Sequence, residues 1–420
     1  MTSKCRFNAN MKAINIHKLG FFILGMVTVG FLLGLALQAE AQVPFTISGS
    51  FPVSSGAGAV VTGDFNSDGK VDLVVASRAN DVVSLLLGNG AGSFGAPTTF
   101  TVGNGPVDLT AGDFYKDGMT DLAVANEGPP GTVSILLGTD TGSIFDPKTD
   151  YGVGSTTTRS VAAGDLDNDT ILDLATANYT LYDTESEYVS ILLGTGDGSF
   201  AAATNTYAGP TPGWVEMGDL DGDYDLDLIV ANVFDNTVSI LLGAGNGSFG
   251  SPTDFAAGPY PVSLALGDVD GDGDLDIAIA NDSTDYVTIL LGDGHGSFAA
   301  GAKPVAGQYP RSVSMSDFDG DGNLDLLVGR QFNSNDGDNG SNAISLLLGD
   351  GTGSFGSPVT IFSLSISTGA IHDPYMAIDD FNGDQKPDIA VADTSDNHVT
   401  ILLNNPVRAM PWIPLLLLGD

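Results

Sequence analysis

Short apolar segments separated by polar turns recur along most of this 420-residue chain. In one stretch they are Pro261–Asp268, Leu275–Ala280, Tyr286–Leu291 and Phe298–Val305, each rich in Val, Ile, Leu, Thr or Ala. Gly, Asn, Asp and Pro bound these segments, which is typical of β-strands joined by tight turns. Beyond residue 41 no sustained helical period occurs, because glycine interrupts the apolar runs. The pattern therefore predicts an all-β fold.

The same unit occurs seven times. Each copy carries D-x-D/N-x-D-G-x-x-D or a close variant, then L/I-x-V/I-A, then an apolar string ending in L-L-L-G or a variant; most copies add G-S-F. Segments such as Ser239–Leu242 are apolar on both faces, so they are expected between neighbouring sheets. Four antiparallel strands in a unit that cannot bury both faces alone are typical of a propeller blade. The first aspartates of the copies are Asp64, Asp113, Asp165, Asp219, Asp268, Asp317 and Asp380.

Seven copies predict a seven-bladed β-propeller over residues 42–405. The last copy ends at Leu403 without a fourth strand, whereas the segment Phe45–Val53 precedes the first copy and resembles the outer segment Thr99–Val102. We expect this N-terminal segment to be the outer strand of the last blade and to close the ring. A linear solenoid is the alternative, and it leaves that segment unpaired and one sheet face exposed.

The acidic loop of each copy predicts a metal site. In the fifth copy, positions 1, 3, 5 and 9 are Asp268, Asp270, Asp272 and Asp276, and Gly273 allows a positive φ at the turn. Converging carboxylates supply the hard oxygens that suit Ca²⁺, and no His or Cys is present to suit zinc or copper. Ordinary Asp-Gly hairpin turns are the alternative, which seven copies make a poor explanation. An EF-hand is excluded because position 12 is a strand residue in every copy.

The loops differ in how complete their ligand sets are, so up to seven calcium sites are expected, three of them strongest. The complete sets are Asp64, Asn66, Asp68 and Asp72; Asp268, Asp270, Asp272 and Asp276; and Asp317, Asp319, Asp321 and Asp325. Three sets lack only the glycine at position 6, replaced by Thr170, Tyr224 or Gln385: Asp165, Asp167, Asp169 and Asp173; Asp219, Asp221, Asp223 and Asp227; and Asp380, Asn382, Asp384 and Asp388. The remaining loop has Asp113, Asp117 and Asp121 but Tyr115 at position 3, so we expect a weak or empty site there.

Residues 1–41 resemble a signal peptide. A basic region precedes the apolar stretch Leu19–Leu37, and Ala39-Glu40-Ala41 forms a cleavage site. We therefore expect secretion, to an extracellular or periplasmic location, with no membrane span after cleavage. An uncleaved anchor is the alternative, because the stretch is long enough to span a bilayer.

Cleavage would leave a very acidic chain without disulfides. It removes Cys5, the only cysteine, together with four basic residues and one acid, so the formal charge changes from −38 to −41. Such a surface repels nucleic acid and anionic membrane and suits divalent cations.

The repeat, with its acidic loop, L-x-V-A strand, L-L-L-G strand and G-S-F turn, resembles the FG-GAP repeat of the integrin α-subunit head and the bacterial variants grouped with VCBS repeats. The resemblance covers about residues 43–405. It implies a seven-bladed propeller with Ca²⁺ in the loops between the first and second strands, and a role in adhesion or recognition of an extracellular protein or glycan. Integrin signalling across a membrane is not implied.

A binding module is the first functional hypothesis, and we expect a monomeric propeller. A calcium-dependent carbohydrate-binding lectin is the second, and a polysaccharide-acting enzyme such as a lyase is the third. No catalytic motif occurs, and His295, His372 and His398 are expected to have local roles. Fold alone does not decide among these functions.

The ligand-binding face is expected opposite the calcium loops. The loops of irregular length, Tyr179–Tyr188, Arg330–Asn342 and Ser363–Tyr375, belong to that face, and variable loops on a rigid scaffold commonly carry recognition. The alternative is that these loops are spacers and the aromatic residues cap strands. The apolar tail Pro406–Asp420 is either a sorting or anchoring remnant or a truncated repeat. The candidate ligand residues are Tyr182, Trp214, Phe234, Tyr260, Tyr309, Phe332 and Tyr375.

Overall fold

In the computed structural model, the described residues are 45–140, 143–178, 187–331, 342–363, 375–394 and 396–405. The expected signal peptide, with Cys5, and the apolar tail lie outside them. Among the described residues, no helix is long and apolar enough to cross a membrane.

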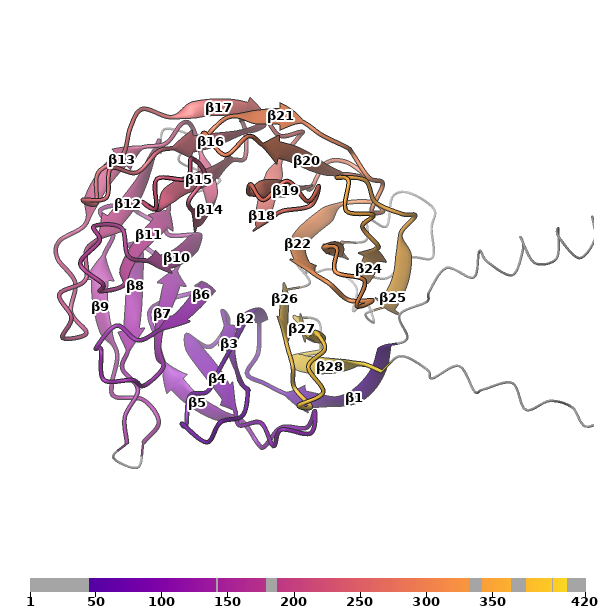
Figure 1. Cartoon of the computed structure of the whole chain (residues 1–420). Coiled ribbons are helices and arrows are strands. Elements are labelled where there is room, and N and C mark those ends of the chain that lie inside the picture. The colour runs from indigo at the N-terminus through magenta and orange to yellow at the C-terminus, as the bar shows by residue number, and fades with distance from the viewer. Residues whose placement is uncertain are drawn as a thin grey trace, which may run out of the picture. The chain divides into compact units, whose positions relative to one another are not determined.

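Seven four-stranded antiparallel sheets make up the described chain, arranged around a central axis (Figure 1). Blade 1 is β2–β5, blades 2 to 6 follow in sequence order, and blade 7 is β26, β27, β28 and β1. This confirms the predicted seven-bladed propeller.

Each blade runs from an inner to an outer strand. The first, innermost strands are β2 (Ala57–Gly63), β6 (Pro106–Gly112), β10 (Ser160–Gly164), β14 (Pro212–Gly218), β18 (Pro261–Gly267), β22 (Pro310–Ser316) and β26 (Tyr375–Asp379). The second strands are β3 (Asp72–Ser77), β7 (Asp121–Asn126), β11 (Asp173–Ala177), β15 (Asp227–Asn232), β19 (Asp276–Asn281), β23 (Asp325–Arg330) and β27 (Asp388–Asp393). The third strands are β4 (Val82–Leu86), β8 (Thr132–Leu136), β12 (Tyr188–Leu192), β16 (Thr237–Leu241), β20 (Val287–Gly292), β24 (Ala343–Leu347) and β28 (His398–Asn404). The fourth, outer strands are β5 (Thr98–Thr101), β9 (Thr149–Gly152), β13 (Thr204–Tyr207), β17 (Thr253–Ala256), β21 (Phe298–Ala300), β25 (Val359–Ser363) and β1 (Phe45–Pro52).

The second and third strands form the core between blades. Every residue of β19 is buried, as are the last four of β16, in agreement with their apolar character on both faces. One apolar cluster joins Val74 and Leu85 of blade 1 to Leu109 and Leu122 of blade 2. A blade is therefore stabilised by its neighbours, as expected for units that cannot bury both faces alone.

The N-terminal strand closes the ring. β1 pairs antiparallel with β28, from Phe45 opposite Asn404 to Pro52 opposite His398. The Phe51 ring packs edge-on against Phe94 of blade 1, with ring centroids 5.5 Å apart. The expected closure by an outer strand from the chain's beginning is confirmed, and the solenoid alternative is wrong.

The outer strands are shorter than the sequence predicts. In blade 5 the expected strand Phe298–Val305 is β21, which has three residues, followed by an isolated bridge between Tyr286 and Val305. Gly301 and Pro304 lie between these two pieces. Hydrogen bonds to the third strand continue beyond Gly301, from the N–H groups of Ile289 and Val287 to the carbonyls of Ala302 and Pro304 at 3.0 and 3.1 Å, so the segment is an irregular strand.

Candidate metal centres

The seven acidic loops join the first strand of each blade to the second, so they all lie at one end of the propeller. At position 6 every loop has a positive φ, between 65° and 95°. Glycine occupies this position in four loops, and Thr170, Tyr224 and Gln385 adopt the same conformation in the others. The expected positive φ at Gly273 is therefore general to the repeat, although a side chain there carries a conformational cost.

The aspartate at position 1 organises the turn. In all seven loops its Oδ2 accepts a hydrogen bond from the backbone N–H of position 6, at 2.7–3.1 Å. The loop backbone therefore wraps around this carboxylate.

The aspartate at position 9 links the loop to the blade. In Asp276, Oδ2 accepts from the N–H of Val269 at 2.8 Å, and Oδ1 accepts from the N–H of Gly292 at 2.8 Å. The equivalent pair of bonds occurs in every blade, at 2.6–3.1 Å. These buried carboxylates thus hold together the acidic loop and the end of the third strand.

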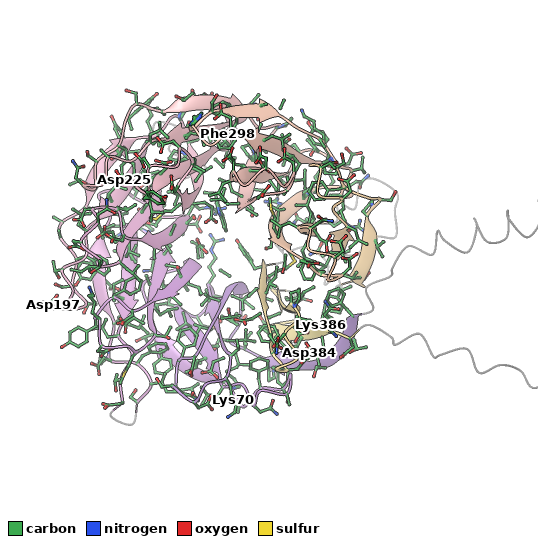
Figure 2. All side chains as sticks on the ribbon, viewed as in Figure 1. Lys70, Asp197, Asp225, Phe298, Asp384 and Lys386 are labelled. Atoms are coloured by element: carbon green, nitrogen blue, oxygen red, sulfur yellow. The ribbon has the colours of Figure 1, made fainter. Side chains whose placement is uncertain are left out.

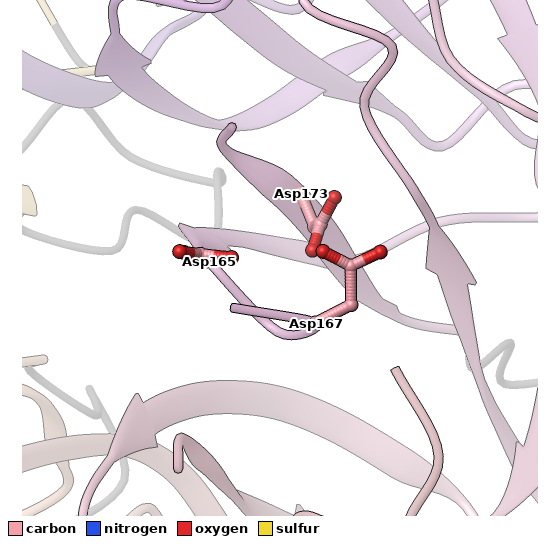
Figure 3. A group of neighbouring side chains, drawn as sticks. All are labelled: Asp165, Asp167 and Asp173. Carbon is pink, nitrogen blue, oxygen red and sulfur yellow. The ribbon is translucent and has the colours of Figure 1, made fainter. Parts of the chain in front are cut away.

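Four loops bring three carboxylates together. In each, one oxygen from positions 1, 3 and 9 lies within 4.8 Å of the other two, and Figure 3 shows the group of blade 3. These clusters could hold a metal ion. They are Asp165, Asp167 and Asp173; Asp219, Asp221 and Asp227; Asp268, Asp270 and Asp276; and Asp317, Asp319 and Asp325.

The carboxylate at position 5 does not belong to these clusters. In all seven loops its Oδ1 accepts from the N–H of position 7, at 2.8–3.1 Å. The expected ligands Asp169, Asp223, Asp272 and Asp321 therefore stabilise the turn in this structure.

The electrostatics of the clusters fit a cation. Burial, and then the charge of the position 5 carboxylate, raise the pKa of Asp167, Asp221, Asp270 and Asp319. Asp270 Oδ1 is also buried without a hydrogen-bond partner. An acceptor atom of this kind is costly unless a proton or cation satisfies it. Because every side-chain atom that could bind the ion is a carboxylate oxygen, the cluster suits a hard divalent ion.

The other three loops differ at position 3. Asn66 and Asn382 replace the aspartate in blades 1 and 7, and each offers an amide oxygen. The position 5 carboxylates of these loops pair with lysines: Lys70 Nζ lies 2.9 Å from Asp68, and Lys386 Nζ lies 3.5 Å from Asp384 (Figure 2). In blade 2 the position is Tyr115, which is exposed.

The sequence did not reveal that, among the described residues, five loops are also tied to the next blade by a backbone hydrogen bond. The carbonyl of Leu220, at position 2 of the blade 4 loop, accepts from the N–H of Gly296 in the G-x-G-S-F turn of blade 5, at 2.9 Å. Blades 7 and 1 show the same link, in which the N–H of Gly92 donates to the carbonyl of Phe381 at 2.8 Å. The Phe381 ring also packs against Phe94 there. The recurrence of G-x-G-S-F was the only signal of this contact. An ion in a loop would therefore order a joint between blades.

The position 9 carboxylates predict an unusual pH dependence. Burial raises the pKa to about 6 in six of them, namely Asp72, Asp121, Asp173, Asp227, Asp325 and Asp388. Between the unfolded value, about 3.9, and this folded value, the folded state binds more protons, so its stability falls as pH rises. We expect metal-depleted protein to melt higher near pH 5 than near pH 7.5. Differential scanning calorimetry after dialysis against chelator tests this; a higher midpoint at the higher pH would contradict it.

The second face is formed by the turns between the second and third strands and by the connections between blades. Phe234 and Tyr260 lie there and pack edge-on, with ring centroids 5.2 Å apart, and Tyr309 precedes β22. Trp214 lies within β14, and its Nε1 donates to Glu216 Oε1 at 2.9 Å. Tyr375 begins β26 and packs against the cores of blades 1 and 7. Tyr182 and Phe332 lie outside the described residues.

The fold and these loops define a class of protein: a β-propeller with acidic candidate metal centres at one end. The profile of a family described as FG-GAP-like repeat matches residues 64–124, 113–176, 219–279 and 268–328, together more than half of the chain. The chain therefore belongs to the FG-GAP-like repeat family. The predicted resemblance is confirmed.

Solved structures share the architecture at low identity. One is virginiamycin B lyase from Staphylococcus aureus, with a TM-score of 0.56 and 13% identity over 85% of this chain and 99% of that one. Another is a functionally unknown protein from Desulfotomaculum acetoxidans, with a TM-score of 0.52 and 13% identity over 76% of this chain and 88% of that one. At such identities the likeness shows the fold alone. No curated protein matches the sequence.

Proposed function

We propose that this protein is a secreted, calcium-binding propeller that recognises an extracellular protein or glycan. One observation carries the calcium assignment: in four blades the oxygens of positions 1, 3 and 9 converge within 4.8 Å. Carboxylates at this spacing repel one another unless a cation lies among them. The N-terminal signal-like segment, residues 1–41, supports secretion into a compartment where millimolar calcium can fill weak sites.

The ligands we assign are the aspartates of positions 1, 3 and 9, completed by the position 5 carboxylate once an ion attracts it. Blades 5 and 6 combine the three-carboxylate cluster with glycine at position 6, so they should bind most tightly. Blade 1 offers Asn66 in place of a carboxylate and should be weaker than these two. Blade 2, with Tyr115 at position 3, should bind least.

A matched pair of substitutions tests the assignment. Asp270→Ala removes the position 3 oxygen from the blade 5 loop, whereas Tyr115→Ala changes the same position of the blade 2 loop, which has no carboxylate there. We expect isothermal titration calorimetry to show one fewer calcium ion bound to Asp270→Ala and an unchanged number bound to Tyr115→Ala. Equal stoichiometry for the two variants would show that position 3 is not a ligand.

We place ligand recognition on the second face, opposite the metal loops. The residue directly before the first strand has a positive φ in five blades: Gly56, Gly105, Thr211, Tyr260 and Tyr309. In each of these blades its carbonyl accepts a hydrogen bond from the N–H of the residue directly after the second strand, at 2.9–3.1 Å. The five positions are therefore equivalent. Glycine adopts this conformation freely, whereas tyrosine does so at a cost of about 1 kcal/mol. Tyr260 packs against Phe234, and a role of both tyrosines in binding would also account for this cost.

The positions of the arginine side chains also favour the second face as the site of ligand recognition. The four arginines among the described residues lie at the starts of first strands or the ends of second strands: Arg78, Arg159, Arg311 and Arg330. Two of them pair with Glu127, and Arg311 pairs with Asp282 at 2.8 Å. These ion pairs join neighbouring blades around the strands that line the axis. They form a polar surface on the same face as the exposed Tyr260 side chain.

Replacing the strained tyrosines with glycine separates binding from stability. We expect the free energy of unfolding of Tyr260→Gly and of Tyr309→Gly to lie within about 1 kcal/mol of that of the unsubstituted protein, because relief of the positive φ offsets lost packing. Both should weaken binding to whatever glycan or protein the unsubstituted chain retains on an array. Lys303→Ala, on the outer rim beside Tyr286, is the control. Normal binding by both glycine variants would place recognition elsewhere.

A further inference from the structure

A cavity of about 390 Å³ lies among the first strands of blades 4 to 7, which surround the propeller axis (Figure 1). Strands β14, β18, β22 and β26 line it. Its volume falls in the range of small-molecule sites. The proposed roles of the metal loops and of the second face do not explain the side chains that line this cavity.

Glu216 is the exceptional residue of this cavity. It pairs with Ile229 in the ladder between β14 and β15, which fixes its place in the repeat. The side chains at the same register in the other six blades are small and neutral: Val61, Thr110, Ala162, Ala265, Ser314 and Ala377. The repeat therefore requires no carboxylate at this position, and blade 4 alone places one there.

Trp214 also departs from the repeat. At the same register in three other blades, a side-chain oxygen accepts a backbone N–H of the following blade: Asp108 from Val161 at 2.9 Å, Ser160 from Val215 at 3.3 Å and Ser263 from Val313 at 3.3 Å. An indole has no acceptor, so Trp214 forgoes this link. Its Nε1 instead donates to Glu216 Oε1. The two exceptional residues of blade 4 thus form a pair inside the cavity.

The remaining lining selects the class of ligand. Met217, Met315 and Met376 provide adaptable apolar surface, and among the described lining residues Tyr375 is the only ionisable side chain besides Glu216. None of the described lining residues is a lysine or arginine, which disfavours an anion. One carboxylate offers too few oxygens for calcium. A wholly apolar ligand would leave Glu216 without a role.

We propose that the central cavity binds a small organic cation, a quaternary or protonated amine with an apolar body, through the Glu216 carboxylate and the Trp214 ring. Carboxylate and indole both attract such a cation, and the methionines cover its alkyl groups. This site is independent of the calcium loops and of the second face.

The titration of Glu216 gives the site a pH dependence. Burial, opposed by the Trp214 hydrogen bond and reinforced by the charge of Asp108, raises the pKa of Glu216 to about 7. The charged group near it is Asp108, whose own charge is partly offset by Arg159, and the neutral Tyr375 phenol also lines the cavity. Because the ionised carboxylate attracts the cation, affinity should rise as pH increases through about 7 and level off above it.

Trp214 reports occupancy directly. In a Trp412→Phe chain it is the only tryptophan, so its fluorescence can follow titration with choline and with 3,3-dimethylbutan-1-ol, a neutral molecule of the same shape. We expect saturable binding of choline about tenfold tighter than that of the alcohol at pH 8. Glu216→Gln should remove this preference and the pH dependence, and Thr110→Ala, at the same register of blade 2 and outside the cavity lining, should retain both.

Several outcomes overturn the proposal. Equal affinity for choline and the alcohol, absence of saturable binding by either, or full choline affinity in Glu216→Gln would each do so. If Glu216→Gln melts well below the unsubstituted protein, the pH titration of the Trp412→Phe chain decides. Choline affinity that is unchanged between pH 5.5 and pH 8 then contradicts a role for the carboxylate.

Discussion

Removal of calcium should lower the melting temperature of this propeller more than any single substitution. An ion that binds only the folded state at ten to a hundred times its Kd contributes about 1.4–2.7 kcal/mol per site. Four three-carboxylate clusters together should contribute on the order of 8 kcal/mol, which corresponds to a fall of roughly 15–30 °C in a large domain. Five of the loops are hydrogen-bonded through the backbone to the next blade, so this loss falls on joints of the ring.

Differential scanning calorimetry with calcium and with chelator measures this effect. Magnesium is the control, because it demands near-ideal octahedral geometry and retains its water, so it should restore little of the lost stability. An unchanged midpoint in chelator would contradict the calcium assignment. Equal rescue by magnesium and calcium would show that the loops respond to charge alone.

Deletion of residues 45–52 should open the ring. The deletion removes the whole of β1, exposes the ladder edge of β28 and takes Phe51 from its contact with Phe94. Loss of a four-stranded blade's outer strand and of two half-buried phenylalanines, Phe45 and Phe51, should cost roughly 4–6 kcal/mol. An unpaired strand edge also promotes association between chains.

Chemical denaturation and size-exclusion chromatography measure these two consequences. As a control, Ile47→Ser leaves the strand in place and changes a side chain that is 62% exposed, so it should behave like the unsubstituted chain. A deletion variant with unchanged stability that remains monomeric would show that closure by β1 contributes little.

The repeat made the fold predictable from the sequence. Seven copies fix the number of blades, and the orphan segment beginning at Phe45 implies closure, because a missing outer strand and a spare one occur at opposite ends of the repeat array. The expected outer strand of blade 5, Phe298–Val305, is divided in the structure because Gly301 and Pro304 make its ladder irregular. Strand length depends there on ladder contacts that an apolar pattern does not encode.

The metal loops were predictable as a set, but the different roles of their four acidic positions were not. Spacing identified positions 1, 3, 5 and 9 together, yet in the structure the position 5 carboxylate binds the backbone of its own turn, as Asp272 does with the N–H of Asp274 at 3.0 Å. Short-range side-chain to backbone bonds of this kind compete with other partners and depend on loop geometry. The second role of Asp276, as an acceptor for Gly292, also required the tertiary structure.

The central pair illustrates a different limit. The sequence predicts Trp214 as an aromatic residue of the second face, and it does not distinguish Glu216 from its neighbours within an apolar strand. Only the register of β14 with β15 shows that both depart from the repeat on the same side of one strand. A structural alignment of the seven blades is therefore what makes them visible.

The most direct test of the central claim is the number of calcium ions bound per chain, measured by equilibrium dialysis at millimolar calcium. The geometry of the loops predicts at least four ions, of which one is lost in Asp270→Ala. A chain that binds no calcium under these conditions would contradict the claim.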